Sequence, residues 1–436
     1  MNNGIKIPKA KVLFWPLGNA DLETVKQDVA RALASLRSAN VDVTAIEEII
    51  WWDPKQIPRL ARTLGNKEKE FDLVLIFSAT HRTVRCISAI GRRFSKLPLV
   101  IWAVPERYSL ATSGLAASYL RERGHYVKMF NNAADDRSVL PEIETIARAA
   151  RSYRLSRRMQ VGIIGKRSPL MISWPYNLVL LKSKLGPTVH EIPLPKLERA
   201  LKSVTDAQVE DTLEEYKQKY KVNVSDETLG KAVRFQLAVR KLTEKLKLDA
   251  IALECWTNLF LKYGVNPCLG HLDDLIVGCE GDIMSMSGQL ILRGINGVNP
   301  YLADILSVDT KKNTIELSHC SAPISLASDP SKIEISERTD PGRAGKTAFA
   351  HFQIGGGEVT LARFFGRGMD KLHITHGVMR PSDAYWGGIS MTIDSEGNSS
   401  EFLDTVSGNH YLLTFGDVRK ELKLFARWSG LEVIEN

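Results

Sequence analysis

Apolar residues in the first third of the chain follow two alternating patterns. Short apolar runs, such as 11–18 and 71–79, have the length of buried strands, and segments such as 21–39 carry apolar residues at helical spacing. Strands that alternate with helices are typical of a parallel sheet covered on both faces. Residues 1–157 are therefore predicted to form a flavodoxin- or Rossmann-like α/β domain, with Asp21 as the cap of its first helix.

The alternation resumes in residues 158–300, which are predicted to form a second α/β domain. Its most charged part, 196–247, has the spacing of an exposed pair of helices. An apolar run at 275–277 is followed by a Met- and Gly-rich helical pattern at 282–294. The end of that apolar run is a candidate ligand site, because open α/β sheets bind ligands at the carboxyl ends of their strands.

The last third of the chain has a different pattern of apolar and polar residues. Short alternating or β-branched segments, such as 313–324 and 357–366, are separated by Gly, Pro, Asp and Asn, which is typical of antiparallel strands. A charged helix is predicted at 417–430. Residues 301–436 are therefore predicted to form a β-rich, barrel-like domain. The predicted fold class is α/β, with two doubly wound parallel-sheet domains followed by this β-rich one.

Composition narrows the classes of function. Of the 436 residues, 44% are apolar and 25% are charged, which is ordinary for a globular protein. The net charge of +8 is spread along the chain, and no aromatic-interleaved or zinc-finger pattern points to nucleic-acid binding. The Arg-rich stretch 148–158 is predicted to be a helix with its arginines facing solvent. Five cysteines without CxxC spacing, and no apolar run near the roughly 20 residues of a membrane span, predict a cytoplasmic protein that binds no membrane.

Three acidic residues follow the apolar run that ends the second domain's strands. Glu280 has no evident structural role, Asp282 stands where a helix cap is expected, and Asp304 suits a turn cap equally well. His319 and His410 lie at predicted element boundaries, and each alone is more typical of a hydrogen-bonded core histidine. A set of two carboxylates and two imidazoles would suit a divalent metal such as Mn²⁺. The separations of 24, 15 and 91 residues match no local motif.

Several motifs between residues 253 and 417 resemble the L-fucose isomerase and L-arabinose isomerase superfamily, in particular its short, fucose-isomerase-like members. These motifs are "LECWTN", "GVNPCLGHLDDLIVGCEGD", "NPYLAD", "IELSHCSAP", "GEVTLARF" and "GNHYLLTFGD". The first half of the chain resembles the family more loosely. The resemblance implies a three-domain subunit, aldose–ketose isomerisation of a free pentose or 6-deoxyhexose, and Mn²⁺ as cofactor, with Co²⁺ or Mg²⁺ as alternatives.

The resemblance also implies roles for individual residues. The metal ligands in "CEGD", "YLAD" and "GNHY" correspond to Glu280, Asp304 and His410. His319, in "LSHC", corresponds to a fourth ligand or a near-site residue. A bound metal would polarise the sugar carbonyl and stabilise an ene-diolate. Glu280 and Asp304 would then act as the acid–base pair that moves a proton between C2 and C1.

The motifs indicate less clearly which residues would bind the sugar. Four residues in or near the matching motifs are candidates for it: Trp256, Arg363, Trp386 and Asn409. Core packing explains the tryptophans equally well, and a structural ion pair explains the arginine. The family implies a homo-oligomer, a trimer or hexamer, with the active site near a subunit interface. A metal-dependent sugar epimerase and a non-catalytic sugar-binding protein are the alternative functions.

Overall fold

The structure is a computed structural model, and it describes residues 7–165, 167–169, 171–172, 176–255, 258–272, 275–338, 346–382 and 388–436. The chain divides into two compact units, Pro8–Arg154 and a larger one that contains Leu155–Asn436. The candidates Trp256 and Trp386 lie outside the described residues. In the described part of the chain, no helix has both the length and the apolar character needed to cross a membrane.

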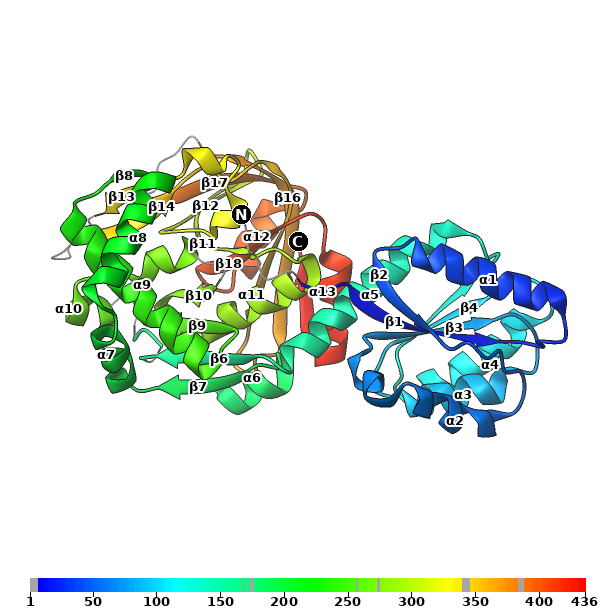
Figure 1. The fold of residues 1–436 in the computed structure, drawn as a ribbon. Helices are drawn as coiled ribbons and strands as arrows, with labels where there is room; N and C mark the ends of the chain where they lie inside the picture. Colours follow the sequence, from blue (N-terminus) through cyan, green and yellow to red (C-terminus); the bar gives the residue numbers. More distant parts are fainter. Residues whose placement is uncertain are drawn as a thin grey trace. The chain divides into compact units, whose positions relative to one another are not determined.

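The N-terminal unit is built on a five-stranded parallel sheet with the order β2-β1-β3-β4-β5 (Figure 1). Its strands are β1 (Ala10–Leu17), β2 (Val41–Ala45), β3 (Leu73–Ser78), β4 (Leu99–Ala103) and β5 (Val127–Asn131). Its helices are α1 (Glu23–Arg37), α2 (Ile57–Thr63), α3 (Val84–Arg93), α4 (Ser109–Arg121) and α5 (Leu140–Ser156). This is the strand order of flavodoxin-like folds, and the predicted parallel α/β architecture is confirmed.

The apolar runs of this sheet are buried because helices cover both of its faces. Trp15 of β1 belongs to the same core cluster as Ile87 of α3 and Leu120 of α4, and α1 lies on the opposite face (Figure 1). The prediction that Asp21 caps α1 is wrong. The helix begins one residue later, with Leu22 at the cap position and no side-chain hydrogen bond there.

The Arg-rich helix α5 does not turn all its arginines to solvent, so that prediction is wrong for two of them. Arg151 is only 7% exposed and donates to the carbonyl of Pro8 at 2.8 Å. Arg154 Nε lies 2.5 Å from Oδ1 of the buried Asp72. A buried carboxylate is costly without a partner, and this ion pair supplies one within the N-terminal unit.

The larger unit starts with a four-stranded parallel sheet in the order β10-β9-β6-β7. Its strands are β6 (Gln160–Ile164), β7 (Thr188–Ile192), β9 (Ala250–Leu253) and β10 (Ile276–Gly278). The helices of this part are α6 (Leu178–Lys184), α7 (Leu194–Lys202), α8 (Asp206–Lys219), α9 (Asp226–Leu246), α10 (Asn258–Tyr263) and α11 (Ile283–Asn296).

The expected exposed helical pair at 196–247 is wrong in both number and burial. The segment forms α7, α8 and α9, with the short strand β8 (Lys221–Asn223) before α9. Nine residues of α9 are buried, Leu229 and Phe235 among them. The many charged residues mark only the solvent face of this amphipathic helix, which packs its other face into the core.

The C-terminal part contains a closed antiparallel barrel of six strands, as the predicted barrel-like domain required. The order is β15-β18-β11-β12-β17-β16, and β16 pairs back to β15. The strands are β11 (Tyr301–Asp309), β12 (Thr314–His319), β15 (Gly357–Phe365), β16 (Lys371–Pro381), β17 (Ile389–Ser395) and β18 (His410–Phe415). A separate three-stranded sheet has the order β14-β13-β8, with β13 (Glu334–Arg338) between β14 (Thr347–His351) and β8. The remaining elements are the helices α12 (Ser399–Thr405) and α13 (Arg419–Ser429), and β19 (Glu432–Glu435), which pairs with β16.

Helix α11 connects the parallel sheet to the barrel. Every residue from Ile283 to Ile295 is buried, so the helix is enclosed on all sides. A Cβ added at Gly288 would lie 2.5 Å from Leu412 Cδ1 on β18 and 2.8 Å from Phe364 Cδ2 on β15. The backbone of α11 therefore lies directly against the barrel wall. This contact places the short loop before α11, which carries Glu280, beside the barrel strands.

Candidate active site

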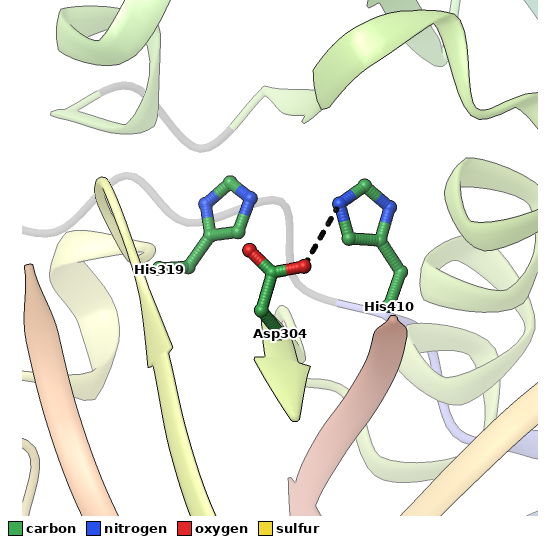
Figure 2. Close-up of side chains that lie close together, drawn as sticks. All are labelled: Asp304, His319 and His410. Carbon is green, nitrogen blue, oxygen red and sulfur yellow. Dashed lines mark ion pairs between the residues drawn. The ribbon is translucent and has the colours of Figure 1, made fainter. Parts of the chain in front are cut away.

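Three barrel strands bring one acid and two histidines to the same end of the barrel. Asp304 on β11 pairs directly across from His410 on β18 and, on its other side, from Ser318 on β12. His410 is the first residue of β18, and His319 is the last residue of β12. Because both strands run antiparallel to β11, their start and end meet beside Asp304. Figure 2 shows the three side chains converging.

These three side chains have the spacing of a metal-ligand set. One ligand atom from each of Asp304, His319 and His410 lies within 4.8 Å of the others. His410 Nε2 is 3.7 Å from Asp304 Oδ1, the ion pair drawn in Figure 2, and the two imidazole centroids are 5.6 Å apart. Both histidines are buried, and Asp304 is partly exposed. One carboxylate and two imidazoles suit a divalent ion such as Mn²⁺.

Glu280 reaches the same place from the parallel sheet. It lies in the short turn Cys279–Gly281 that follows β10, with a φ of 57° in the left-handed region that non-glycine residues rarely adopt. Its N–H donates to Cys255 Sγ at 3.4 Å, and its carbonyl accepts from Ser168 N at 3.1 Å. These contacts hold the peptide on both sides. Glu280 Oε2 thereby comes to 3.9 Å from His410 Nε2.

The electrostatics of Glu280 fit a bound cation. Its Oε2 atom is buried and accepts no hydrogen bond from the described residues. Burial raises the pKa of Glu280 to about 7; nearby His410 opposes this rise and the Asp304 carboxylate adds to it. A buried carboxylate beside a second carboxylate is costly unless a cation accompanies it. The residues present therefore fit a divalent metal ligated by Asp304, His319 and His410, with Glu280 beside them.

Asp282 has two roles, and the sequence indicated only one. Its Oδ1 accepts from Ser285 N at 2.9 Å, which confirms the predicted cap of α11. Its Oδ2 also lies 3.0 Å from His410 Nδ1. Burial alone would raise the pKa of Asp282, but the bond to His410 and its charge lower it overall. Nothing in the sequence links these two residues, which are 128 positions apart.

Known proteins with related sequences are sugar isomerases by name. No family model matches the chain. It is 27% identical over 444 residues to the sulfoquinovose isomerase of Priestia megaterium, covering 97% of this chain and 98% of the relative. The sulfoquinovose isomerase of Alkalicoccus urumqiensis is 26% identical over 393 residues, covering 84% and 86% of the two chains. These similarities support a sugar isomerase. Membership of the fucose and arabinose isomerase superfamily stays a prediction.

The two described candidates for sugar binding contact the ligand residues. Arg363 Nε donates to the carbonyl of Ser407 at 2.9 Å, and its guanidinium also donates to the carbonyl of His410. Asn409 Nδ2 donates to Asp304 Oδ1 at 2.8 Å. Both contacts fix the positions of His410 and Asp304. A direct contact of Arg363 or Asn409 with a sugar stays a prediction.

Proposed function

We propose that this protein is a metal-dependent aldose–ketose isomerase. The observation that carries the proposal is the convergence of Glu280, Asp304, His319 and His410 from two different sheets. The similarity to named sugar isomerases along 97% of the chain supports the reaction class. A protein that only bound sugars would not require two carboxylates and two imidazoles around one point.

The four residues divide the chemistry between them. Asp304, His319 and His410 would hold a divalent cation, with Glu280 as a further ligand. The bound cation supplies Lewis-acid polarisation of the carbonyl and hydroxyl oxygens of an open-chain sugar. One of the two carboxylates removes the proton from C2 and returns it to C1, while the hydroxyl proton moves from O2 to O1. The aldose thus becomes the ketose without gain or loss of atoms.

We further propose that the substrate is a hexose with an anionic group at C6. Sulfoquinovose, the sugar in the names of the relatives, is a glucose that carries a sulfonate in place of the hydroxyl group on C6. The net charge of +8 favours the approach of an anion over that of a neutral sugar. Neutral pentoses and 6-deoxyhexoses are the comparison substrates.

The test is a panel of free sugars, with ketose formation measured after metal removal and after adding back Mn²⁺, Co²⁺ or Mg²⁺. The panel contains sulfoquinovose, glucose, aldopentoses and neutral 6-deoxyhexoses. The expected result is metal-dependent turnover that is fastest for sulfoquinovose. Glu280→Gln is expected to lower turnover by about 100- to 10,000-fold, the usual range for losing a general acid–base group. Asp394→Asn, at an exposed carboxylate paired with Arg380 on the barrel, is the matched control and keeps wild-type turnover.

Product analysis in deuterated water separates the isomerase from its alternatives. An isomerase places deuterium on C1 of the ketose, whereas an epimerase yields a new aldose labelled at C2 and no ketose. Sugar binding without any product would favour the non-catalytic function. Near-normal turnover by Glu280→Gln would exclude the proposed acid–base role.

A further inference from the structure

The buried carboxylate of Asp282 lies on the side of His410 that faces away from the other candidate ligands. His410 Nδ1 is 3.0 Å from Asp282 Oδ2, whereas His410 Nε2 is 3.7 Å from Asp304 Oδ1 and 3.9 Å from Glu280 Oε2. The two ring nitrogens therefore have different surroundings. A carboxylate can only accept a hydrogen bond, so the proton of the neutral imidazole belongs on Nδ1. The lone pair of Nε2 is then directed at Asp304 and Glu280.

We propose that Asp282 is the positioning residue that fixes His410 in the tautomer and orientation needed for binding a metal through Nε2. The inference rests on the proposed function, because it concerns the same metal site. A carboxylate behind a metal-bound histidine is a general device that fixes the ring and makes the nitrogen a better ligand. In this chain the device links two sheets: Asp282 follows the parallel strand β10, and His410 begins the barrel strand β18.

The capping role of Asp282 does not by itself explain an aspartate here. The cap uses Oδ1, which accepts from Ser285 N, and Ser, Thr or Asn would serve it equally well. An aspartate that is 3% exposed costs more to bury than any of those neutral residues. Its second oxygen, Oδ2, accepts from both Ser285 Oγ, at 2.6 Å, and His410 Nδ1. The backbone cap therefore uses Oδ1 alone, and Oδ2 is the oxygen that contacts the histidine.

Two substitutions separate these roles. Asp282→Asn keeps an oxygen for the cap, but its amide would donate to Nδ1 and move the ring proton to Nε2, against the metal. Asp282→Ser also keeps a cap residue and withdraws the partner of Nδ1. Both variants are expected to fold, since Asn and Ser are ordinary cap residues. The control is Ser225→Ala, which removes the side-chain cap of a different helix, α9. Ser225 is far from the candidate metal ligands in the sequence.

The measurements are the Mn²⁺ dissociation constant by calorimetry, and the melting temperature of each metal-free protein. Both Asp282 variants are expected to bind Mn²⁺ about 10- to 100-fold more weakly than the wild type, with metal-free melting temperatures close to that of the wild type. Ser225→Ala is expected to show the opposite result, a lower melting temperature with an unchanged dissociation constant. Wild-type Mn²⁺ affinity in folded Asp282→Asn and Asp282→Ser would overturn the positioning role.

The Mn²⁺ affinities and the sugar assays together distinguish a failure of the positioning role of Asp282 from a failure of the proposed isomerase function. If the wild type binds Mn²⁺ but isomerises no sugar of the panel, the isomerase proposal fails, and the positioning role still stands or falls by the affinities of the variants. If the wild type isomerises sugars and the variants retain its Mn²⁺ affinity, only the positioning role fails. A wild type that binds no divalent ion overturns the positioning role and the metal dependence of the reaction together.

Discussion

The two parallel sheets of this chain end in different surroundings at their carboxyl edges. In the N-terminal unit, polar groups at the ends of β3 and β4 bond to one another: Ser78 Oγ lies 3.0 Å from Thr83 Oγ1, and Arg107 Nε donates to the carbonyl of Ala79 at 2.8 Å. In the larger unit, β10 ends against a barrel that contributes Asp304, His319 and His410. Among the described residues, these three side chains form the group whose spacing suits a metal ion.

The buried acids of the two units show the same contrast. Asp72 is held by Arg154 and by the N–H of Lys11, so its charge is balanced by a nearby cation. Glu280 instead faces Asp304 and has a buried oxygen without a hydrogen-bond partner among the described residues. A balanced buried charge contributes to the fold, whereas an accumulation of like charges costs stability and is typical of functional sites.

The largest expected effect comes from replacing each of these acids by its amide. Asp72→Asn leaves Arg154 without its partner and is expected to lower the free energy of unfolding by about 3 kcal/mol, the lower end for a broken buried pair because Arg154 keeps some exposure. Glu280→Gln removes a buried charge and its repulsion by Asp304, and is expected to leave that free energy unchanged or higher. Urea denaturation measures the free energy of unfolding of both variants. A loss at Glu280→Gln as large as at Asp72→Asn would contradict the contrast.

Metal binding is expected to cause the next largest change in stability, and only in the larger unit. At a free Mn²⁺ concentration of about 100 times the dissociation constant, binding stabilises the folded site by about 2.7 kcal/mol. Hydrogen–deuterium exchange should therefore slow in peptides covering 278–285, 301–306, 315–320 and 408–413. Peptides from 10–131 serve as the internal control and should not change. Equal protection in both units, or in neither, would contradict a metal site at the barrel.

Much of this architecture was predictable from the sequence, because local patterns determine it. The continuous apolar run in β3 follows from burial of this strand on both faces of its sheet. The burial of the helices at 196–247 was predicted wrongly because charged residues dominate the composition of this segment. The buried face of α9 becomes evident only when its residues are placed around the helix.

The candidate site was predictable as a set of residues, and only in part as a geometry. Glu280, Asp304, His319 and His410 were identified through motifs, and the structure brings them together. The pairing of Asp304 with His410 depends on strand register across the barrel, which no local pattern reveals. The bond between Asp282 and His410 depends on packing of the parallel sheet against the barrel, so the sequence suggested a cap and nothing more.

The smallest expected changes in stability come from substituting two helix glycines, one in each unit. Gly288 lies against Leu412 and Phe364, and a Cβ there would come within 2.8 Å of both, whereas a Cβ at Gly114 of α4 would meet nothing within 4 Å. Gly288→Ala is therefore expected to lower stability by at least about 1 kcal/mol through overpacking. Gly114→Ala is expected to raise it by about 0.5–1 kcal/mol, because alanine favours helix more than glycine does.

The readout for this pair is the melting temperature together with Mn²⁺ affinity. Because α11 packs against β18, which begins with His410, displacement of the helix by Gly288→Ala should also weaken Mn²⁺ binding, while Gly114→Ala should leave it unchanged. If Gly288→Ala lost stability and kept wild-type Mn²⁺ affinity, α11 would support the core without holding the site. The geometry of the site would then depend on the loop at Glu280 and on the barrel strands alone, rather than on the helix between the two sheets.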